Sequence, residues 1–383
     1  MKIFTKIIFF TIFISICTGQ LLYASEKIKI GLLVPLSGKD AYIGDSIIKS
    51  VKLAINKIDS NQIEIFPKDT KNDPTTTLKA AKDLNEQGIK IVIGPIYNKN
   101  LIYLEELKDM TFISLTNKTL KIPKNVISAG INSLSQINAI IKFQELKMLE
   151  KTIFLIPDSH YEDEIKKSIK DKKVKLEKIY IYNSEPTKLT KQIEKITQYK
   201  ARQLNLKYEI NKISKSDDPN KEKKLEKLEK MDTLGNVNFD SIVIADFDES
   251  LKSITTSLLY VDVYPKEIFF ITLNQWFDSS LLKEKTSQPL YFPSINYKNY
   301  KNFSKNYYSQ FKEYPNQLSI ISYDLIGLIY YLILQNNFIV DEKLFIKKNK
   351  FKGMTGIFEI KKNKINHVLN FYKIENNEFK KIF

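Results

Sequence analysis

The sequence predicts an α/β protein of two lobes, each built on a doubly wound parallel sheet, with a helical insertion in the second lobe. Short apolar runs recur along the chain, and most are continuous rather than alternating, as in parallel strands buried on both faces. Segments with apolar residues at helical spacing separate these runs, which gives strand–helix–strand units of roughly 30 residues. The series begins again at Thr152, which predicts a second sheet of similar design.

Eight runs are expected to form the parallel strands: Ile28–Val34, Gln62–Phe66, Ile89–Ile93, Thr111–Leu115, Thr152–Ile156, Lys175–Tyr182, Ser241–Ala245 and Glu267–Thr272. The helices expected between and after them are Gly44–Ile58, Thr75–Glu86, Ser133–Leu149, Tyr300–Lys312 and Leu318–Leu334. Terminal strands are expected at Met354–Ile360 and His367–Ile374. This order predicts that the chain crosses back to the first lobe before it ends.

One segment breaks the alternation of strands and helices. Residues 185–236 form a long, strongly charged helical stretch, in which 191–213 and 221–231 are separated by Ser216-Asp217-Asp218-Pro219. Only thin apolar stripes run along these helices, which predicts a helical hairpin that protrudes from the second lobe. A surface for contact with a protein and a solvated insertion without a partner are both compatible with this pattern.

The N-terminus has the pattern of a secretory signal peptide. Two lysines precede an apolar run from Ile7 to Leu22, and small residues follow at Ala24 and Ser25. We expect residues 1–24 to be removed on export to the periplasm or cell envelope. A membrane anchor is the alternative, although the run is short for a span. A lipid anchor at Cys17 is a further alternative, but Ile16 is a poor fit to the small residue that such processing requires.

The length of the remaining chain predicts two lobes. The first lobe is expected to comprise residues 25–132 and about 285–336. The second is expected to comprise residues 133–284 and about 337–383, with the insertion at 187–236.

Composition excludes several kinds of site. Cys17 is the only cysteine, so the exported chain has no disulfide, thiol nucleophile or thiolate metal site. The formal net charge is +16, but the lysines are spread along the chain without a basic run interleaved with aromatics, which argues against nucleic-acid binding. The two histidines, His160 and His367, have no metal-binding spacing, and no nucleophile or phosphate-binding motif is present. We therefore expect a non-enzymatic protein without cofactor or metal.

A ligand-binding cleft has a physical rationale in this fold. Ligands of doubly wound sheets bind beyond the carboxyl ends of the strands, where loops and helix N-termini meet. The candidate residues follow strands in both lobes and are Ser37, Tyr97, Asn98, Ser114, Thr116, Tyr161 and Trp276. Each has an alternative structural role: Ser37 as a helix cap and Trp276 in core packing are examples.

Several motifs resemble type I periplasmic binding proteins of the leucine/isoleucine/valine-binding class. They are Ile30-Gly31 with Pro35-Leu36-Ser37-Gly38, Ile91-Val92-Ile93-Gly94-Pro95, Ser322-Tyr323-Asp324 and Phe351-Lys352-Gly353-Met354-Thr355-Gly356. The resemblance implies two lobes joined by three crossovers, with a hinge that closes on a ligand. Amino-acid receptors of this class carry small hydroxyl residues after Gly-Pro, whereas this chain has Ile96, Tyr97 and Asn98, which puts an amino-acid ligand in doubt.

The insertion is similar to that of the penicillin-binding protein activator branch of the same class. The similarity covers residues 196–202 through the second helix to 238–243, and then 258–263 and Trp276. It implies that the chain acts by contact with a peptidoglycan synthase. The alternative is a solute receptor that delivers an amino acid or a similar small molecule to the permease of an ABC importer.

Overall fold

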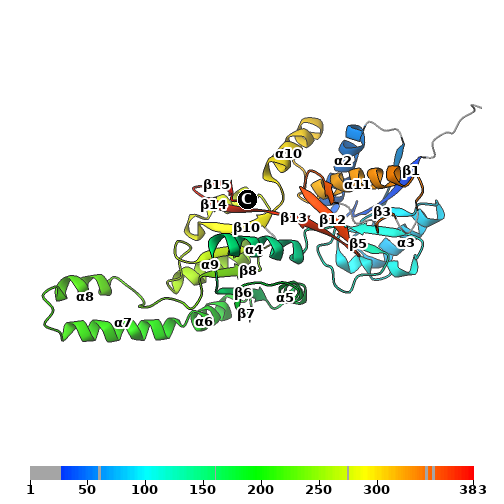
Figure 1. Ribbon diagram of the computed structural model, residues 1–383. Coiled ribbons are helices and arrows are strands. Elements are labelled where there is room, and N and C mark those ends of the chain that lie inside the picture. Colours follow the sequence, from blue (N-terminus) through cyan, green and yellow to red (C-terminus); the bar gives the residue numbers. More distant parts are fainter. Residues whose placement is uncertain (1–26, 59–61, 160, 274–275, 341–343, 347–349) are drawn as a thin grey trace, which may run out of the picture.

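The computed structural model describes residues 27–58, 62–159, 161–273, 276–340, 344–346 and 350–383, which form two α/β lobes and a projecting helical arm (Figure 1). The first sheet has the order β11-β12-β13-β5-β4-β3-β1-β2. Its strands are β1 (Ile28–Val34), β2 (Ile63–Asp69), β3 (Ile91–Ile93), β4 (Thr111–Ser114), β5 (Val126–Ser128), β11 (Lys350–Lys352), β12 (Ile357–Lys361) and β13 (Lys364–Val368). All neighbours from β13 to β2 are parallel, whereas β11 and β12 extend the sheet as antiparallel strands.

The second sheet has the order β15-β14-β10-β9-β8-β6-β7. Its strands are β6 (Thr152–Pro157), β7 (Leu176–Tyr182), β8 (Ser241–Ile244), β9 (Phe269–Thr272), β10 (Leu290–Ser294), β14 (Asn370–Glu375) and β15 (Glu378–Lys381). The strands from β7 to β10 are parallel, and β14 and β15 are antiparallel. The predicted fold class is confirmed: both sheets are dominated by parallel strands and flanked by helices.

Helices cover both faces of each sheet, which explains the continuous apolar strands. In the first lobe α2 (Ala41–Ile58) and α11 (Ser319–Gln335) pack on the face that carries Ile30 and Leu32, and α3 (Pro74–Glu86) covers the face of Leu33. Gly31 points toward α3, where an added Cβ would lie 2.7 Å from Leu84.

In the second lobe α4 (Ser133–Lys147) and α5 (Glu162–Lys170) cover one face of the sheet, and α6 (Pro186–Ile196) and α9 (Asp248–Tyr260) cover the other. Phe143 of α4 stacks on Phe371 of β14, with ring centroids 4.3 Å apart. The helix α10 (Tyr297–Phe311) links the lobes, because it begins next to Phe277 of the second lobe and ends with Tyr307 hydrogen-bonded to Ser46 of α2.

The strand pairing differs from the predicted crossover points. Residues 285–336 were expected in the first lobe, but β10 at Leu290–Ser294 pairs with β9 and β14 in the second sheet. Residues 337–383 were expected in the second lobe, but β11, β12 and β13 belong to the first sheet. The last of the three crossovers therefore lies at Leu369, between β13 and β14, and not near residue 336. The reason is that β12 and β13 form a hairpin whose second strand continues the parallel sheet beside β5.

The segment after β7 forms α6, α7 (Tyr199–Ser214) and α8 (Lys221–Glu229), and α7 and α8 project from the second lobe as an arm (Figure 1). Helix α6 belongs to the lobe rather than to the arm, because Leu189 and Ile193 are buried in its core. None of the described helices is long and apolar enough to cross a membrane.

Candidate functional site

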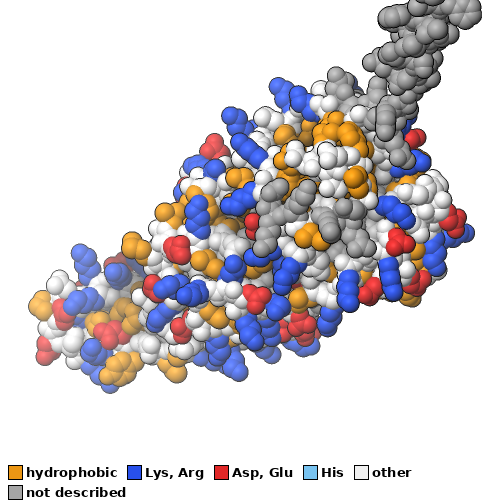
Figure 2. All heavy atoms as spheres, turned by 45° about the vertical axis from the view of Figure 1, so that its right-hand side comes forward, with side chains coloured by type: hydrophobic (Ala, Val, Ile, Leu, Met, Phe, Trp, Pro, Cys, Tyr) orange, Lys and Arg blue, Asp and Glu red, His pale blue; other side chains and the backbone are white. Residues whose placement is uncertain are grey.

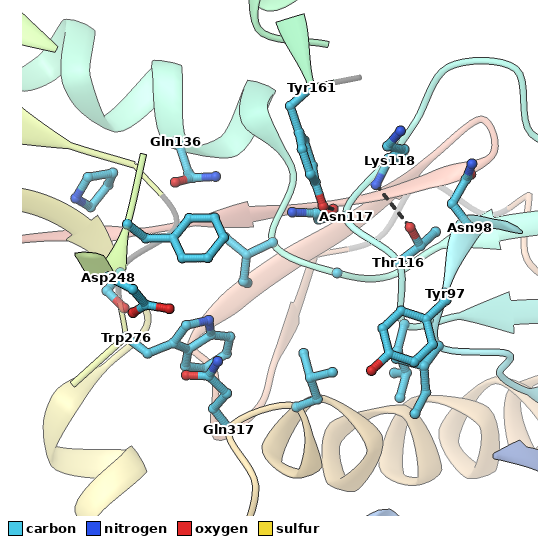
Figure 3. A pocket seen from close by; sticks show the side chains of 18 of the residues that line it. Tyr97, Asn98, Thr116, Asn117, Lys118, Gln136, Tyr161, Asp248, Trp276 and Gln317 are labelled. Carbon is cyan, nitrogen blue, oxygen red and sulfur yellow. Dashed lines mark hydrogen bonds between the residues drawn. The ribbon is translucent and has the colours of Figure 1, made fainter. Parts of the chain in front are cut away.

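A cleft of about 670 Å³ lies between the two lobes (Figure 3). On the first lobe it is lined by the loops that follow β3 and β4 and by the N-terminal end of α11. On the second lobe it is lined by α4, by the residue that precedes α5, by the start of α9 and by the segment after β9. The site therefore lies at the carboxyl ends of both sheets, as expected for this class of fold.

Five of the seven predicted residues line this cleft: Tyr97, Asn98, Thr116, Tyr161 and Trp276. Ser114 does not, because it is fully buried and donates to the carbonyl of Pro95 over 2.6 Å, which fixes the loop after β3. Ser37 does not either; it is exposed and donates to Asp69 over 2.6 Å in the turn after β1. Both serines thus shape loops near the site.

The sequence analysis missed several lining residues, including Lys99, Lys118, Gln136, Asp248 and Gln317. Gln136 lies in the first turn of α4 and Gln317 in the turn before α11, so neither directly follows a strand in the sequence. Lys118 follows the predicted Thr116 loop directly, so the carboxyl-end rule could have included it.

The aromatic hydroxyls of the cleft remain protonated hydrogen-bond donors. Burial raises the pKa of Tyr97, and the neighbouring Asp40 carboxylate raises it further. Burial likewise raises the pKa of Tyr161, whose hydroxyl donates to Asn117 Oδ1 over 3.1 Å. Asn98 Oδ1 is buried and has no hydrogen-bond partner among the described residues. The cleft therefore contains neutral phenol hydroxyls and, among its described residues, one buried acceptor without a partner.

The charged residues of the cleft are separated by lobe. Lys99 and Lys118 lie on the first lobe, and Asp248 and Asp278 lie on the second. Figure 3 shows Lys118 and Asp248 on opposite sides of the cleft, with Tyr161 and Trp276 between them. The ammonium of Lys118 lies 5.2 Å from the ring centroid of Tyr161. A ligand with an acidic and a basic end would match this arrangement.

A buried carboxylate holds the two lobes together beside the cleft. Glu164 of α5 is 4 % exposed and belongs to the second lobe. Its carboxylate accepts hydrogen bonds from the loop between β4 and β5 of the first lobe: from Thr119 N over 2.8 Å, Thr119 Oγ1 over 2.8 Å and Leu120 N over 2.6 Å. The contact between Tyr161 and Asn117 lies next to it. We call these bonds of Glu164 the interlobe latch.

The described residues contain no group of three or more His, Cys, Asp or Glu side chains that could hold a metal ion. His160 lies outside the described residues, and His367 is buried in β13, where burial lowers its pKa to about 4. What the cleft offers is hydrogen bonding, aromatic contact and charge recognition, which are the means of binding.

The comparisons agree with this geometry. Residues 27–201 match the family model described as periplasmic binding protein. The fold is that of a type I periplasmic binding protein. The resemblance to this class read from the sequence is thereby confirmed.

Solved periplasmic binding proteins and a regulator share the fold. The C-terminal domain of LpoA from Haemophilus influenzae, described as a regulator of PBP1A, is similar over 93% of this chain and 100% of that chain, with 14% identity and a TM-score of 0.59. LivJ of Streptococcus pneumoniae, solved with isoleucine, is similar over 93% and 99%, with 16% identity and a TM-score of 0.55. A putative branched-chain amino acid ABC transporter protein from Rhodospirillum rubrum is similar over 93% and 100%, with 11% identity and a TM-score of 0.68.

At these identities the similarity describes the fold and leaves the ligand and the partner open. A sequence comparison with curated proteins gives no match. The choice between a regulator and a solute receptor therefore rests on the features of this chain.

Proposed function

We propose that this chain is a non-catalytic binding protein of the cell envelope that acts by contact with a peptidoglycan synthase. The observation that carries the proposal is the arm formed by α7 and α8, which projects from the second lobe and leaves large apolar side chains in solvent. Leu204 is 65% exposed and Tyr208 is 70% exposed. Exposed apolar side chains on a projecting helix are typical of a protein-contact surface.

The root of the arm is built to hold it in one orientation. Arg202, near the start of α7, is 5% exposed. Its guanidinium donates to Thr197 O over 3.1 Å, to Thr233 Oγ1 over 3.1 Å and to Val261 O. The segment that enters the arm and the segment that leaves it also meet at this point, because Leu234 N donates to Arg202 O over 3.0 Å. A solvated insertion needs no such clamp, whereas a contact surface gains affinity from a fixed orientation.

Two further observations support the proposal. The interlobe latch joins the lobes through side chains and backbone of the chain itself, which fixes the surface that the two lobes together present to a partner. The solved domain that shares the fold over its whole length is described as a regulator of PBP1A. This role, and an exported location, are the functions that the resemblance to the activator branch implies.

The test is a variant in which the arm is shortened without damage to the lobe. Deletion of residues 187–236 would also remove α6, whose Leu189 and Ile193 lie in the core of the second lobe. Because Arg202 and Leu234 are hydrogen-bonded neighbours, residues 204–232 can instead be replaced by a short Gly-Ser linker. This variant should keep its unfolding transition and lose association with the synthases of the source organism in a pull-down from solubilised envelope.

A folded variant that still captures the synthase as well as the wild type does would refute the role of the arm. If the shortened variant does not unfold cooperatively, substitutions at Leu204 and Tyr208 take its place in the test. These two side chains are exposed on the arm and are not part of the core of the second lobe.

A solute receptor is the second candidate, favoured by one specific observation. The cleft has lysines on one lobe and carboxylates on the other, together with the unpaired Asn98 Oδ1, as a zwitterionic ligand would require. A ligand at a hundredfold excess over its Kd raises the free energy of unfolding by about 2.7 kcal/mol. Thermal shifts with amino acids, on protein refolded to remove any retained ligand, test this candidate. A shift that Asp248→Asn and Lys118→Gln both abolish would establish it.

A further inference from the structure

One side of the first arm helix, α7, combines apolar and basic side chains. Leu204 and Tyr208 lie one turn apart on it and are 65% and 70% exposed. Three exposed lysines, Lys200, Lys207 and Lys215, share this side, because at 3.6 residues per turn all five positions fall within an arc of about 100°. We call these five residues the outer face of α7. In Figure 2 apolar and basic side chains lie beside one another on the arm, at the left.

The other side of α7 is covered within the arm. Leu206 is 6% exposed, and Ile210 and Ile213 follow it at helical spacing and are partly buried. Helix α8 packs against α7, and its own Leu225 and Leu228 are partly buried. The continuous apolar stripe of each helix therefore serves the packing of the arm. The outer face of α7 is left over, since the arm does not need it to fold.

The positive charge of the outer face is not balanced within the arm. Residues 200–215 contain four lysines besides the buried Arg202, and their single acidic residue is Glu209. Glu209 lies on the other side of α7 and pairs with Lys212 over 3.4 Å. The three lysines of the outer face form no ion pair with a carboxylate of the described chain. Residues 217–230, by contrast, contain five lysines and five acidic residues, so α8 and the turn before it are balanced.

The composition of the outer face favours a protein partner over a bilayer. A helix that lies in a membrane surface buries a broad apolar face, whereas α7 turns its continuous stripe inward and offers only Leu204 and Tyr208 outward. Two apolar anchors at positions i and i+4 fit a groove on a protein, which is the helix-in-groove mode of recognition. Lysines around these anchors favour carboxylates at the rim of the groove, because complementary charges speed the encounter of two partners and exclude wrong ones.

We propose that the outer face of α7 binds in an apolar groove of the synthase whose rim carries carboxylates. This inference rests on the synthase contact proposed above, and it adds which face of the arm makes the contact and which charge the partner surface carries. Leu204 and Tyr208 fill the groove, and the three lysines steer the approach. Helix α8 supports α7 from behind.

Surface plasmon resonance with the purified synthase tests the inference, because it separates association from dissociation. At an ionic strength of about 0.15 M screening confines charge effects to about 8 Å, so only lysines near the contact matter. Lys200→Glu with Lys207→Glu should slow association roughly tenfold and leave dissociation nearly unchanged, since steering acts on the encounter. The matched control, Lys223→Glu with Lys227→Glu on α8, changes the net charge equally and should associate like the wild type. Raising the ionic strength to about 0.5 M should slow association of the wild type but hardly that of the Lys200/Lys207 variant.

Leu204→Ser with Tyr208→Ser distinguishes failure of the inference from failure of the proposed function. This variant should dissociate faster, since apolar anchors act after the encounter. If it does so while the Lys200/Lys207 variant associates as fast as the wild type or faster, the arm contact stands and the acidic groove is refuted. If it binds like the wild type, the arm contact itself is refuted, and the inference with it. Lysine-dependent co-sedimentation with anionic vesicles without synthase binding, or a wild-type dimer that Leu204→Ser with Tyr208→Ser dissociates, would assign the face to a membrane or to a second copy and overturn the inference.

Discussion

The interlobe latch makes a specific prediction about the relative position of the lobes. Glu164→Ala removes all three hydrogen bonds that the carboxylate accepts from Thr119 and Leu120. The two backbone N–H groups then lose their partners in a partly buried place. We therefore expect the lobes to open in the absence of any ligand.

The magnitude follows from the number and kind of these bonds. A hydrogen bond to a charged group contributes roughly 1.5–3 kcal/mol, and water that enters an opened latch recovers part of this. A net loss of about 3 kcal/mol shifts the ratio of open to closed molecules on the order of a hundredfold. Glu164→Gln is the matched control, since its amide oxygen can accept from both N–H groups and its NH2 can donate to Thr119 Oγ1.

Pulsed electron paramagnetic resonance between two spin labels measures the opening. Cys17 is the only cysteine of the sequence, so the chain that begins at Ser25 has none, and labels attach only where cysteines are introduced. Lys124 on the first lobe and Lys170 on the second are exposed and suit this purpose. The account predicts a longer, broader distance distribution for Glu164→Ala and an unchanged one for Glu164→Gln. Superimposable distributions for wild type and Glu164→Ala would refute the latch.

Three other substitutions test the packing that positions the site and the arm. Arg202→Met should lower the free energy of unfolding in urea by about 3 kcal/mol, because three buried oxygens lose their donor. His367 has a pKa lowered to about 4 by burial, whereas an unfolded histidine titrates near 6.5. Only the unfolded state therefore binds this proton between those values, and stability falls as the pH falls from 6.5 to 4. His367→Leu should reduce this fall by on the order of 3 kcal/mol in pH-dependent urea titrations. Gly353→Ala should cost at least about 2 kcal/mol, since its Cβ would lie 2.4 Å from the Asp324 carboxylate, whereas Gly327→Ala meets no atom within 4 Å and should be neutral or stabilising.

Much of the fold could be predicted from the sequence because buried parallel strands are continuous apolar runs. All eight predicted parallel strands are present, and Ile28–Val34 has the predicted bounds, whereas the terminal strand predicted at His367–Ile374 is divided between β13 and β14 in different sheets. Short or interrupted strands were missed, as were the edge strands β11 and β15: β5 has only the three residues Val126–Ser128, and β10 contains Pro293. The terminal strands join their sheets by pairing with strands more than 200 residues away, as Lys364 does with Ser128. The local sequence pattern does not indicate which sheet each of them joins.

The candidate site was predictable where it follows strands. The carboxyl-end rule led to Tyr97, Asn98 and Thr116, which line the cleft. It could not distinguish lining residues from residues that support a loop, such as Ser114, because both are short polar side chains after a strand. The latch was not predictable, since Glu164 is one of three consecutive acidic residues at the start of α5 and only the packing of the lobes shows that it is the buried one.

The central claim is that the arm is the surface that contacts a peptidoglycan synthase, and one affinity measurement tests it most directly. The Kd of the chain for the purified synthase is compared among the wild type, Leu204→Ser with Tyr208→Ser on the arm, and Ile102→Ser with Tyr103→Ser on the first lobe. Loss of two apolar contact residues at about 1 kcal/mol or more each predicts at least roughly tenfold weaker binding for the arm variant. The first-lobe variant should bind like the wild type. Equal affinities of all three proteins would contradict the account.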